Sequence, residues 1–272
     1  MQLNMNPEIG SEVYVKHFNK KLKIENVFVV GNEDEKYVYQ IGYGKDTYIL
    51  KGFRIHLEHV DPEDKKSLEL FVQNLEQISE IFQEYHLARA ASLISPHIAS
   101  PLSLDFVVDM TKDRASLSHL HIQIIFEYGG VALNELQLTT IEQIYNLMRQ
   151  SANALFLLHS LEITHFDIKP ANMVYDARKD LLKIVDMGSA FGGFNQKRLG
   201  ATTTVNLEGK VRSATLEFAP PEVLLMEKGS TEELNLELSL AAVDTYCWAM
   251  SFFAILANRS TNQDWKRITR GS

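Results

Sequence analysis

The sequence predicts an α+β fold in which a small antiparallel sheet with one main helix comes before a mainly helical region. In residues 27–54, apolar and polar side chains alternate, and Val, Ile and Tyr are frequent, as is typical of β-strands. Residues 141–158 instead repeat their apolar side chains at helical spacing. A chain of 272 residues with 45% hydrophobic residues is large enough for two lobes that each bury a core.

Residues 27–54 divide into three antiparallel strands. Turn-forming stretches at residues 31–35 and 42–45 separate the strands, and Lys51 closes the third one. The next elements along the chain are one helix and two strands, expected at residues 68–93, 102–108 and 119–126.

Two histidines, His119 and His121, share one face of the last of these strands and resemble a metal pair. Zinc sites need three or four ligands, and no third ligand is near in the sequence. Two partly buried strand histidines are therefore the better interpretation.

The most distinctive part of the chain is a pair of motifs. Residues 165–172 read HFDIKPAN, and residues 182–188 read LKIVDMG. Two short strands around a turn join the motifs, so a hairpin would bring Asn172 and Asp186 together. The helix before them begins at a candidate capping box, which is formed by Thr140 and Gln143.

Charge and cysteine content limit the possible partners and setting. The net charge of -8 argues against nucleic acid as a partner and mildly favours basic peptides, although a solvated acidic surface is the commoner cause. Cys247 is the only cysteine, and the first five residues lack a signal-sequence pattern, so we expect a cytoplasmic or nuclear location. The apolar residues 238–257 contain Asp244, which is costly in lipid, so we expect a buried helix and no membrane contact.

The two motifs resemble those of a eukaryotic-type protein kinase catalytic domain, which implies a bilobal fold that uses ATP and Mg²⁺. The resemblance makes Asp167 the group that orients a hydroxyl and accepts its proton. It makes Lys169 the group that neutralises the transferring phosphoryl, as in the Ser/Thr-specific branch. Asn172 and Asp186 would be the metal ligands, because Mg²⁺ prefers oxygen.

The same resemblance assigns nucleotide contacts to the first lobe. Lys51 would contact the α- and β-phosphates, held by Glu84 or by its rival Glu80, which lies one helical turn away. The remaining positions are the ends of the phosphate loop, a large residue beside the back pocket and two hinge residues: Gly31, Val38, Phe126, Glu127 and Tyr128.

In the second lobe, residues 215–222 resemble the end of an activation segment, where a peptide substrate docks. Thr215 matches the threonine that bonds the catalytic Asp and Lys, and Glu222 matches an anchoring glutamate. Asp244 matches an aspartate that bonds the backbone of the catalytic loop. A protein substrate with Ser or Thr hydroxyls is therefore expected.

The chain departs from the family pattern in four places. Only Gly31 and Val38 remain of the glycine-rich loop, where acidic residues 33–35 would repel phosphate. Ile49 replaces the usual alanine over the adenine ring, and Met187 replaces a phenylalanine. Phe166 replaces the arginine that receives a phosphorylated activation segment. We expect activity without phosphorylation at residues 202–204 or 213, and a large rise in rate on phosphorylation there would contradict this.

The resemblance also divides the chain into three parts. We expect an N-terminal extension at residues 1–23, the small ATP-binding lobe at 24–127 and the large lobe at 128–272. Kinases generally continue for several helices after the central one, so the large lobe is expected to be truncated. Either the chain is a fragment, or the large lobe is minimal and its lower surface needs a regulatory partner.

Three functions follow in order of preference. The first is an ATP- and Mg²⁺-dependent protein Ser/Thr kinase, supported by Lys51, Asp167, Lys169, Asn172 and Asp186. The alternative is a pseudokinase that acts as a nucleotide-binding or scaffolding module, supported by the acidic loop and the short large lobe. The third is a phosphotransferase acting on a small molecule.

Overall fold

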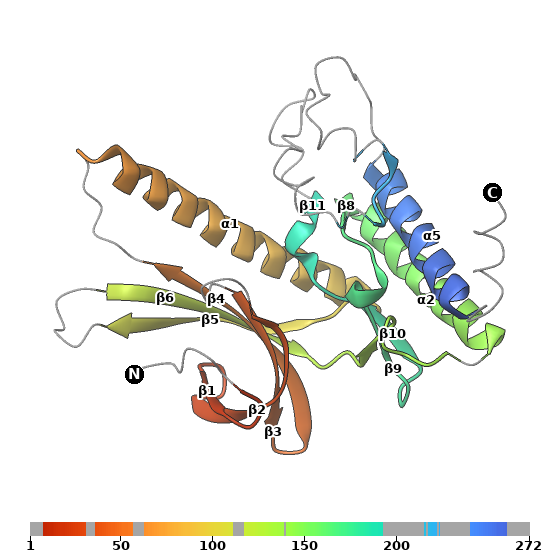
Figure 1. Ribbon diagram of the computed structural model, residues 1–272, viewed down its shortest axis with the longest axis horizontal. Coiled ribbons are helices and arrows are strands. Elements are labelled where there is room, and N and C mark those ends of the chain that lie inside the picture. Colours follow the sequence, from red (N-terminus) through yellow and green to blue (C-terminus); the bar gives the residue numbers. More distant parts are fainter. Residues whose placement is uncertain are drawn as a thin grey trace, which may run out of the picture. The chain divides into compact units, whose positions relative to one another are not determined.

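The computed structural model describes residues 8–30, 36–56, 63–110, 117–138, 140–192, 215, 217–221, 223 and 240–259. The chain divides into two compact units, whose elements are labelled in Figure 1. We call Met1–Tyr85 with Ser100–Tyr128 the sheet unit, and His86–Ala99 with Gly129–Ser272 the helical unit.

The sheet unit contains a six-stranded antiparallel sheet in the order β1-β2-β3-β4-β6-β5. The strands predicted within residues 27–54 and at 102–108 and 119–126 are confirmed. Residues 12–23, assigned from the sequence to an extension, form β1 and the start of β2. The strands are β1 (Glu12–Val15), β2 (Lys20–Val30), β3 (Lys36–Tyr43), β4 (Asp46–His56), β5 (Pro101–Met110) and β6 (Leu117–Glu127).

One helix, α1 (Lys65–Ile94), follows β4 and confirms the helix predicted at residues 68–93. Its first half is fastened to the end of β4, because Asn74 Nδ2 donates to the His56 carbonyl at 2.8 Å. Farther along, Ile81 and Glu84 are buried. Burial of Glu84 indicates that α1 places a charged group in the interior of the sheet unit.

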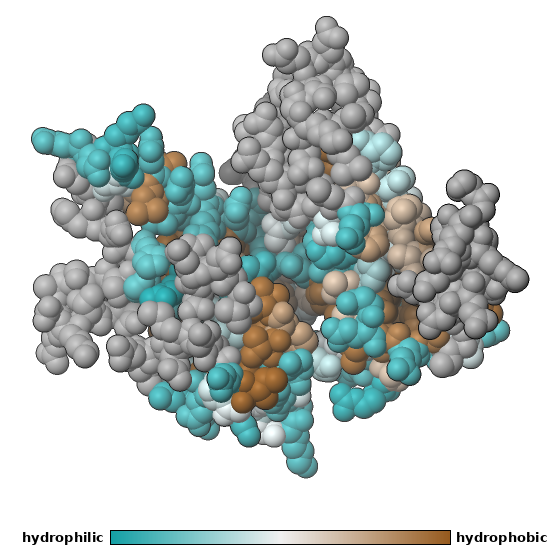
Figure 2. Space-filling view, viewed as in Figure 1, coloured by the Kyte–Doolittle hydropathy of each residue, from teal (hydrophilic) through white to brown (hydrophobic). Residues whose placement is uncertain are grey.

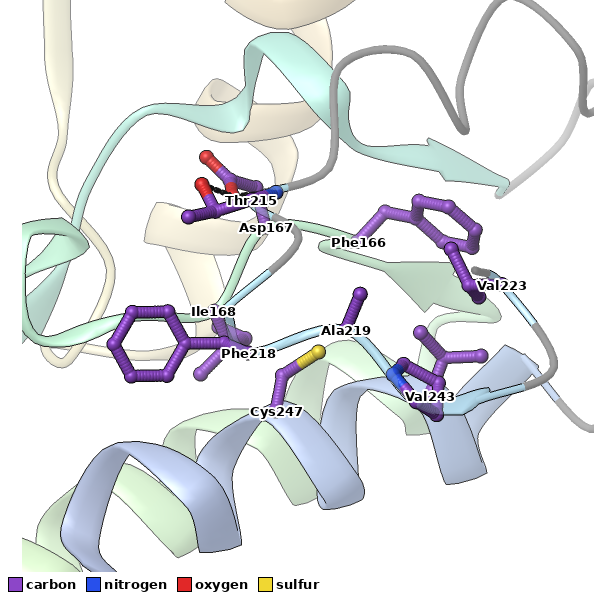
Figure 3. Close-up of a pocket in the computed structure, with 10 residues that line it drawn as sticks. Phe166, Asp167, Ile168, Thr215, Phe218, Ala219, Val223, Val243 and Cys247 are labelled. Atoms are coloured by element: carbon purple, nitrogen blue, oxygen red, sulfur yellow. Dashed lines mark hydrogen bonds between the residues drawn. The ribbon is translucent and has the colours of Figure 1, made fainter. Parts of the chain in front are cut away.

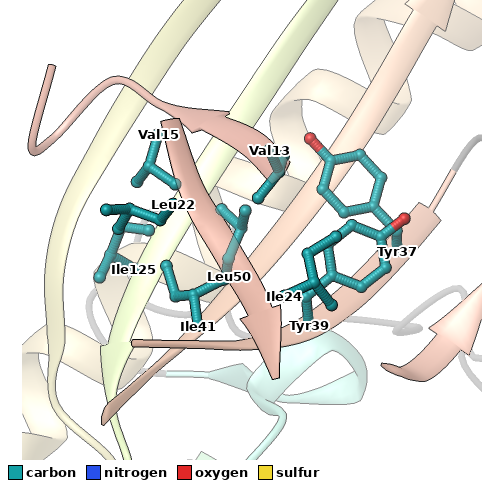
Figure 4. Close-up of a cluster of buried hydrophobic side chains, with 9 residues drawn as sticks. All are labelled: Val13, Val15, Leu22, Ile24, Tyr37, Tyr39, Ile41, Leu50 and Ile125. Atoms are coloured by element: carbon teal, nitrogen blue, oxygen red, sulfur yellow. The ribbon is translucent and has the colours of Figure 1, made fainter. Parts of the chain in front are cut away.

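The two faces of the sheet carry different side chains, and one of them forms the main core of the unit. Along β3 the side chains alternate, and Tyr37, Tyr39 and Ile41 are buried in the main core of the unit. The remaining members of this core come from β1, β2, β4 and β6, as Figure 4 shows: Val13, Val15, Leu22, Ile24, Leu50 and Ile125. Val38, which lies between Tyr37 and Tyr39, therefore faces the opposite side of the sheet.

A glycine on β4 permits this core to form. The Tyr37 ring lies across Gly52, where an added Cβ would come within 1.9 Å of Tyr37 Cζ. Any larger residue at position 52 would displace the tyrosine from the core.

The helical unit is built on two 20-residue helices, α2 (Ile141–Ser160) and α5 (Leu240–Arg259). The predicted capping box at Thr140 and Gln143 is confirmed, since each side chain bonds the other's backbone N–H. The helices are joined by a hydrogen bond from Trp248 Nε1 to Ser151 Oγ at 2.8 Å. Short elements complete this unit: β7 (Val131–Ala132), β8 (Ile163–Thr164), η2 (Pro170–Asn172), β9 (Met173–Asp176), β10 (Leu181–Ile184), η3 (Met187–Ser189) and β11 (Phe191–Gly192).

Apolar side chains also reach the surface of the helical unit. Figure 2 shows hydrophobic surface over α2 and α5, where Tyr145, Phe156 and Phe253 are each at least half exposed. Even so, no helix in the described ranges is both long and apolar enough to cross a membrane.

Candidate active site

In the sheet unit, the predicted phosphate-contacting lysine is paired with a buried glutamate. Lys51 Nζ lies 2.5 Å from Glu84 Oε1, and both side chains are almost fully buried. The ammonium also lies 5.5 Å from the centre of the Phe53 ring, within range of a cation–π contact. Glu80 is exposed, so the structure selects Glu84 over Glu80 as the partner of Lys51.

Three other predicted nucleotide residues share the sheet face of Lys51. Val38 lies directly opposite Lys51 in the β3–β4 pairing, and Phe126 lies opposite Ile49 in the β4–β6 pairing. Directly opposed residues in an antiparallel pair project to the same face, and so do alternate residues of β4. Val38, Ile49, Lys51 and Phe126 therefore form one surface, on which Ile49 is only half-buried.

Glu127 and Tyr128, predicted from the resemblance to be hinge residues, are the last two residues of the sheet unit. Glu127 donates its backbone N–H to the Ser100 carbonyl at 3.4 Å, so that donor is already used within the unit. Gly31 lies outside the described residues, as do residues 33–35 of the acidic loop.

In the helical unit, Asp167 is the centre of a hydrogen-bond network. Its Oδ1 accepts from Thr215 Oγ1 at 2.7 Å and from the Thr215 backbone N at 3.1 Å. Its Oδ2 accepts from Lys169 Nζ at 2.8 Å and from Asn172 Nδ2 at 3.0 Å. Lys169 also donates to Thr215 Oγ1 at 2.7 Å, as the sequence motif predicted for these three residues. The network fixes the position of the carboxylate.

Asp244 of α5 holds the backbone that leads into Asp167. Its Oδ2 accepts from the His165 N at 2.8 Å, and its Oδ1 accepts from the Phe166 N at 2.8 Å. Phe166 has φ 68°, a left-handed conformation that is costly for a bulky residue. Asp244 is fully buried and compensates this strain, as the sequence predicted for an aspartate at this position.

The Phe166 side chain explains one departure from the family pattern. Phe166 is 1% exposed and lines an interior pocket together with Val223, Val243 and Cys247, as Figure 3 shows. An apolar residue here fills the interior, where the family's arginine would reach a phosphate. Residues 202–204, 213 and 222 lie outside the part of the chain that the structure describes.

The predicted hairpin is confirmed and brings the two candidate metal ligands close in space. Strand β9 pairs with β10, and the Val185 N donates to the Asn172 carbonyl at 3.0 Å, so Asp186 follows directly. Asn172 donates through Nδ2, which leaves the amide oxygen for a cation. Asp186 has φ 61° and accepts from the Gly188 N at 3.4 Å. An amide oxygen and a carboxylate are a donor set that fits Mg²⁺.

The strand histidines form no metal cluster. His119 lies opposite His56 in the β4–β6 pairing, with the two rings 4.2 Å apart. Among the described residues, no group of three His, Cys, Asp or Glu side chains is placed to hold a metal ion.

Two supporting residues gave no usable signal in the sequence. His159 Nε2 lies 3.0 Å from Asp244 Oδ2 and adds a contact to the buried carboxylate. Gln150 accepts from the Leu182 N at 2.8 Å and donates to the Asp180 carbonyl at 3.2 Å, so it ties α2 to the hairpin. Both contacts join segments more than 25 residues apart, which spacing along the chain does not reveal.

The Cys247 thiol lies close to residues 166–167. Burial, together with the negative charges of Asp244 and Asp167, raises the pKa of Cys247 to about 12, so the thiol is protonated at neutral pH. A thiol in this state is a poor nucleophile, so Cys247 belongs to the packing of the site.

Comparison with known proteins agrees with this geometry. The model of the protein kinase domain matches residues 64–267. The probable serine/threonine-protein kinase mps1 of Dictyostelium discoideum is 23% identical over 193 residues, which cover 68% of this chain and 17% of that protein. Human cyclin-dependent kinase 9 is 30% identical over 112 residues, 39% of this chain and 28% of that protein.

A shorter match is mitogen-activated protein kinase kinase 7 of Arabidopsis thaliana, 39% identical over 69 residues, 25% of this chain and 22% of that protein. The matched stretches thus span less than a third of each of these three relatives. The domain model nevertheless covers most of the chain, and the α+β architecture is consistent with the bilobal fold of that domain. The chain therefore belongs to the protein kinase family.

Proposed function

We propose that this chain is an ATP- and Mg²⁺-dependent protein serine/threonine kinase that transfers the γ-phosphoryl group of ATP to protein hydroxyls. The observation that carries the proposal is the Asp167 carboxylate, which accepts four hydrogen bonds at 2.7–3.1 Å. Such a fixed carboxylate is suited to orient a hydroxyl and accept its proton.

Substrate binding has to displace one of these four donors. A carboxylate offers about four acceptor sites, and the four bonds occupy them. Lys169 is the donor best able to leave, because its side chain is flexible and 24% exposed. A substrate hydroxyl then takes its place at Oδ2, and the ammonium is free to meet the negative charge of the transferring phosphoryl.

The proposed phosphoryl transfer is a single displacement in which one bond forms, one bond breaks and one proton moves. As the hydroxyl gives its proton to Asp167, its oxygen bonds the γ-phosphorus and the bond to the β-phosphate oxygen breaks, which leaves ADP. Lys51 would contact the α- and β-phosphates, and Glu84, which pairs with the Lys51 ammonium, would keep it in place.

The donor set at Asn172 and Asp186 fits Mg²⁺, so these two residues would hold the metal. The metal, when bound, would neutralise phosphate oxygens. The hairpin positions the two ligands: Asn172 precedes β9, and Asp186 follows β10.

A pseudokinase is the second candidate, because a specific sequence feature favours it. Residues 33–35 read EDE where the family has a loop that cradles phosphates through its backbone. A like-charge contact there costs on the order of 1 kcal/mol or more, which weakens ATP binding. We also propose a cytoplasmic location, because Cys247 is the only cysteine in the sequence and a single cysteine forms no intrachain disulfide.

Phosphoryl transfer to protein tests the proposal directly. The purified chain is incubated with γ-labelled ATP, Mg²⁺ and a mixed protein substrate, beside Asp167→Asn and the exposed-site control Asp46→Asn. We expect label on Ser and Thr with the wild type and with Asp46→Asn, and its loss with Asp167→Asn.

The same samples distinguish the pseudokinase from the active kinase. Thermal melting with ATP and Mg²⁺ reports binding without chemistry. A stabilising shift in all three proteins without label in any of them would establish a nucleotide-binding pseudokinase and overturn the proposed transfer.

A further inference from the structure

The helical unit contains a groove of about 550 Å³ that the proposed chemistry does not use. Four segments line it: the connection after β7, the turn from Lys169 to Ala171, residues 217–218 and one turn of α5. Pockets of roughly this size, about 300–1,000 Å³, hold small ligands or a few side chains.

The groove exists because the connection between β7 and α2 is short. The Leu133 N–H lies within hydrogen-bond distance of the Pro170 and Met173 carbonyls, at 3.1 and 2.9 Å, so the connection starts anchored to the catalytic turn. Thr140 then caps α2. Residues 134–138, the described part of the connection between these points, form no helix, and they leave the space beside Lys169 open.

The walls of the groove are apolar and incompletely covered. Leu136, Leu138, Phe218 and Ile255 line it, and each is only partly buried. When a ligand removes such partly exposed apolar side chains from water, the free energy of the complex falls. The chemistry of the walls therefore fits a large aliphatic side chain.

The rim of the groove adds a charge preference. Asn134 and Gln137 offer exposed amide groups that suit the polar backbone of an extended peptide. Among the lining residues that the structure describes, Glu217 is the one acid, and it is exposed. Lys169 lies in the lining as well, but its ammonium bonds Asp167 and Thr215 and, in the proposed reaction, meets the transferring phosphoryl. The rim thus complements neutral or basic residues and disfavours acidic ones.

Lys169 connects the groove to the proposed reaction. The same residue lines the groove and bonds Asp167 Oδ2 at 2.8 Å, so a chain whose hydroxyl reaches Asp167 passes the mouth of the groove. We propose that the groove binds a large aliphatic side chain of the protein substrate, within a few residues of the accepting Ser or Thr. This inference rests on the kinase function proposed above.

Peptide selectivity tests the inference with defined probes. Peptides with one Ser are varied at each of the four positions on either side, with Leu, Ala, Arg or Asp, and transfer from ATP is measured. We expect one position at which Leu is preferred over Ala by about fivefold or more, with Asp the poorest residue there, because burial of a large aliphatic side chain favours binding.

Two neighbouring residues of α5 provide a matched pair of variants. Ile255 lines the groove, whereas Leu256 is 37% exposed and is not part of its described lining. Ile255→Gln should reduce the Leu-over-Ala ratio to about one, and Leu256→Gln should leave it as in the wild type. Leu136→Gln tests the opposite wall if Ile255→Gln fails to fold, as thermal melting would reveal.

Each other outcome overturns the inference in a recognisable way. Transfer without any apolar preference in the wild type leaves the kinase function standing and removes the groove from substrate selection. A wild-type dimer in sedimentation that Ile255→Gln dissociates would assign the groove to a second copy of the chain. No transfer to any peptide or protein overturns the kinase function, and the inference with it.

Discussion

The two units secure their charged residues in different ways. In the helical unit, Asp167 accepts four hydrogen bonds and Asp244 accepts bonds from the backbone of residues 165 and 166. In the sheet unit, the central contact is an ion pair between a strand and a helix, Lys51 with Glu84. A network distributes the loss of one donor over those that remain, whereas removal of one member of a buried ion pair takes away the opposite charge that its partner was placed against.

The departures from the family pattern also differ between the two units. In the helical unit, Phe166 and Met187 are apolar replacements that are 1% and 2% exposed, so they fill the interior. In the sheet unit, one departure is the half-buried Ile49 in place of alanine, and the other is a run of acids at residues 33–35, which acts on the charge of the ligand. The groups proposed for proton transfer are thus kept, and the altered chemistry concerns how a nucleotide is held.

The largest expected effect comes from breaking the helical network at Asp244. Asp244→Ala removes the acceptor of two backbone N–H groups and of His159, all at 2.8–3.0 Å. Each buried donor left unsatisfied costs about 1–3 kcal/mol, so we expect the free energy of unfolding to fall by about 4 kcal/mol. Urea denaturation measures it. Asp46→Ala, at the exposed first residue of β4, should change it by less than about 0.5 kcal/mol.

A double-mutant cycle examines the ion pair of the sheet unit. Lys51→Met leaves the buried Glu84 carboxylate without its ammonium, and we expect a loss of about 3 kcal/mol in the free energy of unfolding. Glu84→Gln in the same chain should restore about 2 kcal/mol of it, without restoring phosphoryl transfer. Additive losses in the double variant would contradict a direct pair.

The architecture was predictable because its signals are local. Strand alternation and turn residues located the strands from residue 27 onward, and the Thr140 capping box fixed the start of α2. The short strand β1 was missed, although Val13 and Val15 alternate with polar neighbours, because four residues carry too little pattern. Its place is determined by packing against the core of the sheet unit.

The site was predictable only where the motif fixes the chemistry. Sequence spacing could not separate Glu80 from Glu84, because residues four apart lie on the same side of a helix. Tertiary packing decides it, since Glu84 is buried and Glu80 is exposed. The contact between His159 and Asp244 depends on how α2 packs against α5, which no local pattern encodes.

A smaller effect is expected when one donor of the Asp167 network is removed. Thr215→Val deletes the hydroxyl that donates to Asp167 Oδ1 and accepts from Lys169, both at 2.7 Å. A hydrogen bond to a charged group contributes about 1.5–3 kcal/mol, so phosphoryl transfer should fall roughly 10- to 100-fold. Thr215→Ser keeps the hydroxyl and should retain most of the rate. An unchanged rate in Thr215→Val would show that the hydroxyl does not matter.

The smallest expected effect is a loss of stability at alkaline pH, to which each unit contributes one buried group. Burial raises the pKa of Tyr37 in the sheet unit to about 12, and burial with the charges of Asp244 and Asp167 raises that of Cys247 to about 12. Both groups keep their protons when folded and lose them sooner when unfolded, so stability falls as pH rises above the unfolded values of about 9 and 10. At pH 10 we expect Cys247 to account for a loss of about 1 kcal/mol and Tyr37 for less.

Matched variants assign this loss to one unit or the other. Cys247→Ala should remove most of the decline in unfolding free energy between pH 8 and pH 10, measured by urea denaturation at each pH. Tyr37→Phe should change the decline in unfolding free energy little below pH 10 and reduce it above pH 10. The reason is that a tyrosine in the unfolded chain titrates about one unit higher than a cysteine. A decline identical in both variants and the wild type would mean that neither group is linked to unfolding.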